Sequence, residues 1–397
     1  MAKTMRISYF GHDSSDAAIR KRVRTFEKCG YEVHGFMNRR LDGPVPEWRN
    51  VELGETENGA YLNRIWSVFR GAYRAAKHKQ ILIDSDLIVA RNLDMLATAF
   101  LTKRLTGLAT PVVYECLDVH RLLCREDLFG WIARKFEGAF VKRSRGVIVS
   151  SPAFIENHFE RRYSGHYRAF LVENRVSAAF SRSVARPTGG PAPTSATPLR
   201  LGWVGILRCQ RTLDLMVRAA KTFGDEIEIR VHGRPDLWSV PTFHETIEPY
   251  DNISFQGAYE APIDLPEIYG NLDLIWSGDF MEAGLNSKWL LPNRIYEGGY
   301  FGVPAIAPSD TQTGAWVREN RAGFGVAEPI EKTLIEMLSD LISRRDKIEQ
   351  RRELVLNLPD TVFVEPDGFM ADVLDQMINV KTPTPSAPIA IGQPDQA

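Results

Sequence analysis

The sequence alternates short apolar segments with longer amphipathic segments, and it completes this alternation twice. In the first half, the segments that we expect to be strands are residues 5–10, 31–37, 87–90, 111–115, 146–150 and 169–172. In the second half, they are residues 199–204, 227–232, 253–255, 272–276, 305–307 and 325–326. Strands that alternate with helices form a parallel sheet covered by helices on both faces. The pattern therefore predicts an α/β protein with two Rossmann-like domains, and ligands of such sheets bind at the carboxyl ends of the strands.

The stretch between the two halves has the composition of a linker. Residues 181–198 contain few large apolar side chains and many Pro, Gly, Ser and Thr residues. We therefore expect an N-terminal domain over residues 1–180 and a C-terminal domain over residues 199–380, with a last helix at 367–378 that could pack back on the first domain. The Pro-rich residues 381–397 are expected to be disordered, and residues 40–60 to form a long loop.

The charge of the chain is unevenly distributed. The net charge is −1, but residues 1–180 carry 29 Lys and Arg against 20 Asp and Glu, a net of +9. Residues 181–397 carry 20 against 30, a net of −10. A basic half suggests contact with an anionic surface, either nucleic acid or lipid headgroups, although a solvated basic face without a partner is also compatible with it.

Two basic helices of the first half carry aromatic side chains. The segments 61–78 and 127–143 interleave aromatic residues with Arg and Lys, a composition typical of helices that lie on a membrane surface. The alternative is that their apolar stripes belong to the core of the N-terminal domain. The residues that this alternative would bury are Trp66, Phe69, Phe136 and Phe140.

The cysteines and the hydropathy indicate the compartment. Cys29, Cys116, Cys124 and Cys209 show no metal-ligand or disulfide-framework spacing, which favours a reducing compartment. The chain begins directly with a strand pattern, without the features of a signal peptide. No apolar run approaches the ~18–20 residues that a membrane helix needs. We therefore expect a cytoplasmic protein.

One stretch carries the chemistry of a nucleotide site. It runs from Lys288 to Ala307, after the strand at 272–276 and a polar loop at 277–287. Pro292 is placed for the first turn of a short helix, and Gly302-Val-Pro304 ends that helix before the next strand. A strand–loop–helix unit directs free backbone N–H groups and the positive helix end toward the loop. A carboxylate, Glu297, follows one turn after Arg294, so the helix offers both a partner for ribose hydroxyls and an anion cradle.

This stretch resembles the nucleotide-sugar motif of GT-B glycosyltransferases of the GT4-like group, in the form Pro-Asn-Lys-x-x-Glu…Gly-x-Pro. The resemblance implies that Glu297 holds the donor ribose and that Pro292, Asn293 and Arg294 face the diphosphate. The common form of the motif has a second glutamate eight residues earlier, and that position is Trp289 here. Many exopolysaccharide glycosyltransferases keep only the later glutamate, and the chain is most similar to the bacterial, succinoglycan-type members.

Further segments resemble the same family in the same order along most of residues 5–330. They are residues 87–93, 111–118, 146–151, 172–176 and 202–211. In the last of these, Gly205, Arg208 and Arg211 precede a helix, where arginines reach anionic groups. The family has an arginine directly after the glycine and a lysine five residues later, and these places hold Ile206 and Arg211. The resemblance implies that Gly205, Arg208, Arg211 and Lys288 bind the donor, whereas the alternative for the arginines is an ordinary surface role.

The candidate catalytic groups follow strands of the first half. Asp118 and His120 come after the strand at 111–115, and a carboxylate or imidazole there could act as a general base for an acceptor hydroxyl. Asp13 follows the first strand and is a third candidate. Asp16 is better interpreted as a helix N-cap, and Glu115 as a structural residue.

A metal-dependent alternative rests on three residues. Asp84-Ser-Asp86 has the form of the DxD motif of GT-A glycosyltransferases, whose carboxylates bind a divalent ion. GT-B enzymes usually need no such metal, so we expect no cofactor. No Gly-x-Gly-x-x-Gly follows a strand and no P-loop lysine motif is present, which argues against a dinucleotide oxidoreductase or a P-loop enzyme.

These observations and the resemblance imply one function. We expect a glycosyltransferase that moves a hexose, glucose or a related sugar, from a nucleotide-sugar donor, expected to be a UDP-sugar. The expected acceptor is a lipid-linked oligosaccharide of exopolysaccharide biosynthesis, met at the inner leaflet of the cytoplasmic membrane, with no nucleic acid as partner. The alternatives are a GT-B-fold nucleotide-sugar epimerase and a non-catalytic basic protein that binds membrane or nucleic acid.

Overall fold

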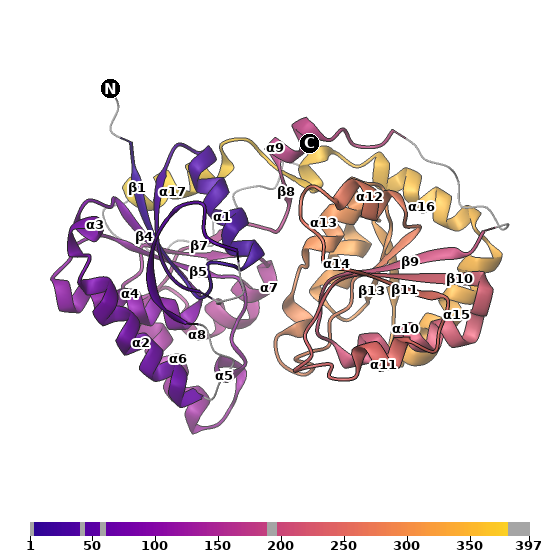
Figure 1. Cartoon of the computed structure of the whole chain (residues 1–397), viewed down its shortest axis with the longest axis horizontal. Helices are drawn as coiled ribbons and strands as arrows, with labels where there is room; N and C mark the ends of the chain where they lie inside the picture. The colour runs from indigo at the N-terminus through magenta and orange to yellow at the C-terminus, as the bar shows by residue number, and fades with distance from the viewer. Residues whose placement is uncertain (1–3, 40–43, 56–60, 189–196, 380–397) are drawn as a thin grey trace. The chain divides into compact units, whose positions relative to one another are not determined.

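The chain folds into two compact units of α/β structure. A computed structural model describes residues 4–39, 44–55, 61–188 and 197–379, with the backbone alone described for residues 61–65 and 379. The first unit comprises Met1–Glu173 together with Asp367–Ala397, and the second comprises Asn174–Pro366. Each unit contains one large parallel sheet with helices on its faces (Figure 1). The predicted fold class is confirmed.

The first unit is built on a seven-stranded sheet. Its strand order is β3-β2-β1-β4-β5-β6-β7, and every neighbouring pair is parallel. The strands are β1 (Arg6–Gly11), β2 (Glu32–Arg39), β3 (Arg49–Glu55), β4 (Leu87–Arg91), β5 (Val112–Cys116), β6 (Gly146–Val149) and β7 (Ala169–Leu171). The helices are α1 (Ala17–Lys28), α2 (Tyr61–Ala76), α3 (Lys79–Ile83), α4 (Asn92–Thr106), α5 (Arg121–Cys124), α6 (Leu128–Val141), α7 (Pro152–Phe154), a π-helical turn (Ile155–Glu160), α8 (Arg161–Tyr163) and α17 (Phe369–Asn379).

Alternation of side chains along the strands gives this sheet two buried faces. Ile7 and Tyr9 belong to one core cluster with α1 and α17, which therefore cover one face. Helix α4 contacts β1, β4 and β5, and both α2 and α6 pack against α4. These three helices lie on the face opposite α1 and α17 (Figure 1).

The second unit is built on a six-stranded sheet of order β11-β10-β9-β12-β13-β14, also parallel throughout. Its strands are β9 (Leu199–Leu207), β10 (Ile227–Pro235), β11 (Ile253–Gly257), β12 (Leu274–Trp276), β13 (Ala305–Pro308) and β14 (Gly323–Val326), and a separate pair is formed by β8 (Val176–Ser177) and β15 (Val364–Glu365). The helices are α9 (Ala178–Ser183), α10 (Gln210–Phe223), α11 (Phe243–Ile247), α12 (Leu265–Gly270), α13 (Asn293–Tyr300), α14 (Gln312–Glu319), α15 (Ile330–Ser343) and α16 (Asp346–Leu356). Short 3₁₀ turns cover Gly224–Glu226, Ser287–Trp289 and Asp360–Val362.

Some elements of the structure differ from the prediction. The prediction of a loop over residues 40–60 was wrong for β3, an edge strand that pairs with β2 on one side only and has just a few apolar residues, Val51 and Leu53 among them. The sequence pattern of residues 330–349 predicts one helix, but the structure has two, because α15 ends at Ser343 and α16 begins at Asp346. Helix α14 was not predicted.

The division of the chain also differs from the expected one. The boundary lies after Glu173 rather than at residues 181–198, and α9 occupies part of that stretch. Helix α17 belongs to the first unit, where Tyr31 Oη donates to Asp375 Oδ1 at 3.1 Å. Residues 189–196 of the expected linker and the expected tail from 380 onward lie outside the described residues. Among the described helices, none is long and apolar enough to cross a membrane.

Candidate functional site

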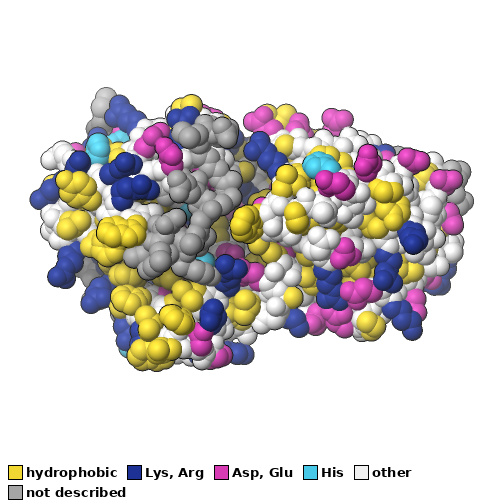
Figure 2. Space-filling view, turned by 60° about the horizontal axis from the view of Figure 1, so that its bottom comes forward, with side chains coloured by type: hydrophobic (Ala, Val, Ile, Leu, Met, Phe, Trp, Pro, Cys, Tyr) yellow, Lys and Arg dark blue, Asp and Glu magenta, His cyan; other side chains and the backbone are white. Residues whose placement is uncertain are grey.

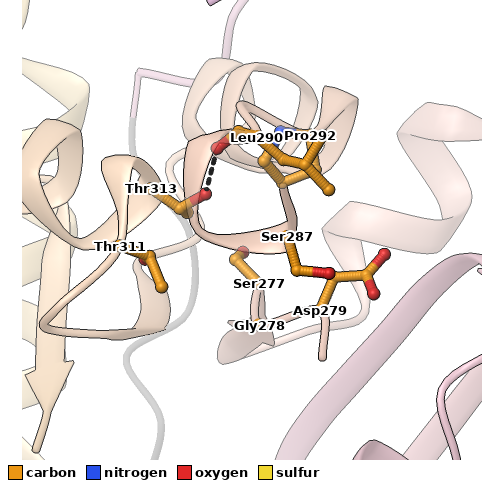
Figure 3. A pocket seen from close by; sticks show the side chains of 8 residues that line it. All are labelled: Ser277, Gly278, Asp279, Ser287, Leu290, Pro292, Thr311 and Thr313. Atoms are coloured by element: carbon orange, nitrogen blue, oxygen red, sulfur yellow. Dashed lines mark hydrogen bonds between the residues drawn. The ribbon is translucent and has the colours of Figure 1, made fainter. Parts of the chain in front are cut away.

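A pocket with an empty volume of about 240 Å³ opens at the carboxyl ends of β12 and β13 in the second unit (Figure 3). It is lined by Ser277, Gly278, Asp279, Ser287, Leu290, Pro292, Thr311 and Thr313. Small residues and hydroxyl groups dominate the lining.

Two helices begin at the pocket. Helix α13 starts at Asn293, and Pro292 takes the N-cap position with an extended backbone, one residue earlier than the first-turn place that we predicted. Thr311 caps α14, where its Oγ1 accepts from Gly314 N at 3.0 Å. Thr313 Oγ1 donates to Leu290 O at 2.8 Å and ties the two helix starts together (Figure 3). Two positive helix ends at one pocket form a suitable environment for an anion.

A buried arginine lies behind the pocket. The side chain of Arg294 is 8% exposed, and its guanidinium donates to Val204 O at 3.0 Å and to Gly278 O at 3.1 Å. Its Nε has no hydrogen-bond partner, and within the described part of the chain no carboxylate forms an ion pair with it. Burial lowers the pKa of Arg294, more strongly than Asp279 raises it. The fold therefore holds a cation whose charge is only partly compensated.

One glycine contacts this arginine, and a second glycine packs closely against the first. Gly205, at φ +128°, is so close that a Cβ there would lie 3.4 Å from Arg294 Nη1. A Cβ on Gly233 of the neighbouring strand β10 would lie 1.7 Å from Gly205 O. Both residues have a positive φ, which disfavours other side chains. Gly205 thus lies beside Arg294, as a shared donor-site role would require.

Glu297 lies one turn further along α13 and is 6% exposed. Tyr269 Oη donates to Glu297 Oε2 at 2.9 Å. Burial, and then the charge of Glu297, raises the pKa of Tyr269 well above its ordinary value. The phenol therefore remains a donor at neutral pH and fixes the orientation of the carboxylate.

Arg208 lies at the start of the loop between β9 and α10 and pairs with Asp279 of the pocket, with Nη2 and Oδ2 3.1 Å apart. Burial raises the pKa of Asp279, but Arg208, the N–H of Met281 and Arg294 outweigh it, and the pKa is lowered. Asp279 is therefore an anion that holds Arg208 at the pocket rim.

The remaining predicted donor residues occupy more exposed positions. Arg211 forms ion pairs with Glu328 and Glu331 at 2.9 and 2.7 Å. A donor phosphate would therefore have to compete with two carboxylates for its guanidinium. Lys288 pairs with Asp310 at 2.5 Å, next to the pocket residues Ser287 and Thr311. Asn293 is exposed at the start of α13.

The predicted catalytic residues lie at the carboxyl ends of β1 and β5 in the first unit. Asp13 is buried, and its Oδ1 accepts from the backbone N–H and the hydroxyl of Ser15 at 2.9 and 2.6 Å. Asp118 is exposed, whereas His120 caps α5, where its Nδ1 accepts from Leu122 N at 3.2 Å. In the order of the sheet, β4 separates β1 from β5.

Two neighbouring acids have structural roles. Asp16 caps α1 by accepting from Ala18 N and Ile19 N, each at 2.9 Å, which confirms the predicted N-cap. Glu115 is fully buried and accepts from Tyr9 Oη, Arg22 Nε and Arg91 Nε at 2.6, 2.6 and 3.0 Å. Burial raises its pKa, but Arg91 and Arg22 outweigh burial and lower it.

The DxD alternative is wrong about its structural setting. Asp84 and Asp86 follow helix α3 and precede β4, so they lie at the amino end of that strand, opposite the ligand edge of the sheet. Asp86 Oδ2 accepts from Arg6 N at 2.9 Å and Asp84 Oδ1 from Gln80 Nε2 at 3.0 Å. In the described part of the chain, no group of three His, Cys, Asp or Glu residues could hold a metal ion.

Tyr269, Asp279, Thr311 and Thr313 are among the site residues that sequence reasoning missed. Asp279 and Thr311 each follow a buried strand within three residues, a position that places side chains at the ligand edge. That signal was available in the sequence. Tyr269 is 28 residues from Glu297, and no local pattern connects the two.

The chain is similar in sequence to the succinoglycan biosynthesis protein ExoL of Rhizobium meliloti (strain 1021). The two are 36% identical over 342 residues, which cover 85% of each chain. No family model matches the chain.

Solved structures share the fold at low sequence identity. The sucrose-phosphate synthase tll1590 of Thermosynechococcus elongatus superposes with a TM-score of 0.70 at 14% identity, over 94% of this chain and 99% of its own. Anabaena Alr3699/HepE, solved in complex with UDP and glucose, gives 0.67 at 14% identity, over 95% and 100%. WaaG, a glycosyltransferase involved in lipopolysaccharide biosynthesis, gives 0.61 at 13% identity, over 94% and 100%. These likenesses show two Rossmann-like domains of the GT-B type.

Proposed function

The chain belongs to the GT-B glycosyltransferase family of the succinoglycan biosynthesis protein ExoL, and we propose that it transfers a hexose from a UDP-sugar to a lipid-linked oligosaccharide in exopolysaccharide biosynthesis. The relative's role in succinoglycan biosynthesis supports the pathway. The complexes of Alr3699/HepE with UDP and with UDP-glucose support the donor. The hexose of the proposal is glucose or a related sugar.

The observation that carries the proposal is the partly compensated charge of Arg294 beside two helix N-termini. Transfer breaks the bond between the anomeric carbon and the diphosphate oxygen, and the leaving diphosphate keeps the electron pair. Preorganised cations and N–H groups stabilise that charge at no cost of reorganisation. Arg294, held by two carbonyl oxygens, and Arg208, held by Asp279, are preorganised in this sense.

Glu297 would bind the donor ribose in this proposal. Its carboxylate is fixed by Tyr269 and lies on the same short helix as Arg294, so one helix would present the ribose partner and a phosphate partner together. Asn293, Lys288, Arg211 and Gly205 complete the proposed donor site, with Gly205 acting through the space that it leaves for Arg294.

The acceptor oxygen attacks the anomeric carbon and loses its proton to a base. Asp118, His120 and Asp13 are the proposed candidates for that base, and all three follow strands of the first sheet. His120 Nδ1 accepts a backbone N–H, so in this arrangement its neutral form carries the proton on Nε2 and has no free nitrogen for a second proton, which favours Asp118 and Asp13. We propose that the reaction is metal-independent and that the acceptor is met at the inner leaflet of the cytoplasmic membrane.

The experiment that tests the proposal is calorimetric titration of the purified chain with UDP, GDP and ADP in the presence of a chelator. UDP is expected to bind most tightly, and a Glu297→Ala variant is expected to lose most of this affinity because the ribose hydroxyls lose their acceptor. The matched control is Glu319→Ala on α14, whose side chain is 67% exposed and distant in sequence from the motif.

Two results would contradict the proposal. One is UDP binding that requires a divalent metal, and the other is UDP binding that is equal in the wild type and the Glu297→Ala variant. Hydrolysis of UDP-glucose without lipid-linked acceptor, lost in the variant, would support the assignment of the donor independently of the acceptor.

A further inference from the structure

Two helices of the first unit expose large apolar side chains to solvent. On α2, Trp66, Phe69 and Tyr73 are 74%, 55% and 62% exposed. On α6, the exposed apolar residues are Leu128, Phe129, Trp131, Ile132 and Phe136, at 66%, 67%, 53%, 38% and 61%. Isolated exposed apolar residues are normal, but a group of this size on neighbouring elements marks an interaction surface.

The exposed residues of each helix lie on one side. Trp66, Phe69 and Tyr73 are spaced by three and four residues, which places them in one stripe. Residues Leu128, Trp131, Ile132 and Phe136 follow the same spacing on α6. The opposite sides are buried, through Ala72 and Ala75 on α2 and through Ala133, Glu137 and Val141 on α6.

The alternative that these side chains form the core of the first unit is therefore wrong for three of the four residues considered. Trp66, Phe69 and Phe136 point to solvent, and only Phe140 packs inward, stacked on Phe100 of α4 with ring centroids 5.1 Å apart. We call the outward sides of α2 and α6, from residue 66 to 79 and from 128 to 143, the α2–α6 face. Both helices pack against α4, and Figure 2 shows apolar side chains gathered on this part of the first unit with Lys and Arg around them.

The charges of the α2–α6 face have one sign. Exposed Arg70 and Arg74 on α2, and Lys77 directly after it, lie beside the apolar stripe, and residues 66–79 contain no acidic residue. Exposed Lys135 lies on α6 and exposed Lys142 and Arg143 directly after it, and the single acid of residues 128–143, Glu137, is fully buried. The ammonium groups stay near the aromatic rings, with Lys77 Nζ 4.8 Å from the Tyr73 ring and Lys135 Nζ 5.5 Å from the Trp131 ring.

We propose that the α2–α6 face is a docking surface for an anionic lipid bilayer, in which the aromatic side chains enter the interface and the Lys and Arg side chains contact the headgroups. Aromatic rings flanked by ammonium groups suit the headgroup level of a membrane, where one end is apolar and the other is wet. A protein partner of ordinary composition offers no such uniform negative charge. Single-stranded nucleic acid combines phosphates with bases that stack on aromatic rings, but the exposed aliphatic side chains of Leu128 and Ile132 offer no stacking surface and favour a lipid interior. The inference deepens the proposed function, which places the acceptor at a membrane, but its test does not depend on the donor site.

The test is co-sedimentation of the full chain with vesicles of phosphatidylcholine alone and of phosphatidylcholine mixed with phosphatidylglycerol. The wild type is expected to bind the mixed vesicles, more weakly at high salt, and to bind the neutral vesicles poorly. Neutralising three charges in Arg74→Gln/Lys77→Gln/Lys135→Gln is expected to weaken binding by at least about tenfold, since each basic residue near the surface contributes ~1 kcal/mol. Trp66→Ser/Phe136→Ser is expected to weaken it by about tenfold or more.

Matched controls come from the second unit. Trp238→Ser removes an aromatic side chain that is 87% exposed, and Arg318→Gln/Lys332→Gln removes two exposed charges. These variants are expected to bind vesicles like the wild type. Calorimetric UDP binding, measured on every variant, reports the donor site separately, so loss of vesicle binding with retained UDP binding isolates the face.

Three outcomes would overturn the inference. They are equal binding to neutral and anionic vesicles, wild-type vesicle binding by both sets of face variants, and failure of the wild type to bind mixed vesicles. In the last case, a concentration-dependent dimer that Trp66→Ser/Phe136→Ser dissociates would assign the face to a second copy of the chain instead.

Discussion

Arg91 in the first unit and Arg294 in the second are both buried, with side chains 3% and 8% exposed, but their charges have different partners. Arg91 faces Glu115 at 3.0 Å and Asp16 at 3.8 Å. Burial opposes its charge, but Glu115, Tyr9 and Asp16 together outweigh burial, and the pKa of Arg91 is raised. Arg294 donates to two carbonyl oxygens, and burial lowers its pKa.

The difference separates a structural cation from a binding cation. A buried ion pair satisfies both partners and leaves little field for a ligand. A buried cation that is hydrogen-bonded only to neutral carbonyl groups keeps most of its electric field, so it attracts an anion that binds beside it. Arg91 is thus neutralised by adjacent carboxylates, while the charge of Arg294 stays only partly compensated next to a pocket.

The largest expected effect is on the first unit. Arg91→Met removes one partner of a buried pair and is expected to reduce the free energy of unfolding by about 3 kcal/mol or more, because Glu115 keeps only Arg22 as an ion-pair partner. Urea denaturation, followed by both fluorescence and circular dichroism because the chain has two units, measures this loss. A change below about 1 kcal/mol would contradict the structural role of Arg91.

A smaller effect on stability and a specific effect on binding are expected at Arg294. Arg294→Met leaves two carbonyl oxygens without a donor, which costs about 1–3 kcal/mol of stability. The variant is expected to bind UDP about tenfold to a hundredfold more weakly, since a hydrogen bond to a charged group contributes ~1.5–3 kcal/mol. Calorimetry measures the affinity, with Arg318→Met on the exposed side of α14 as control. Unchanged UDP affinity in a folded Arg294→Met protein would contradict the assignment of Arg294 as a binding cation.

The smallest expected effect is a pH dependence at Asp279, the carboxylate that acts on both Arg208 and Arg294. Its pKa in the folded protein lies below the value of ~3.9 expected for the unfolded chain. Its contribution to stability is therefore complete above about pH 5 and is lost as the pH falls through the folded pKa. The free energies of unfolding of the wild type and Asp279→Asn, measured by urea denaturation, are expected to differ by about 1 kcal/mol at pH 7 and to converge as the pH falls through the folded pKa. A difference that does not change with pH would mean that the carboxylate acts by packing rather than by charge.

Much of the fold could be predicted because its signals are local. The apolar strands and amphipathic helices of both halves can be recognised from residues that are close in sequence. Ten of the twelve predicted strands start within one residue of the observed ones. The elements that were missed or misjudged have weak local signals, since β3 is stabilised by pairing with β2 and α14 is only eight residues long.

The sequence by itself determined the two-fold α/β organisation, the motif that ends in Glu297 and the basic character of the first half. Only the tertiary structure decided which charges are compensated and which apolar side chains reach solvent. It pairs Glu115 with arginines 24 and 93 residues away, and it turns Trp66, Phe69 and Phe136 outward although they have the spacing of a core stripe. The physical reason is that the compensation of a charge and the exposure of a side chain both depend on residues that folding brings together from distant parts of the sequence. Periodicity along one helix shows that apolar side chains share a face, but it does not show whether another element covers that face.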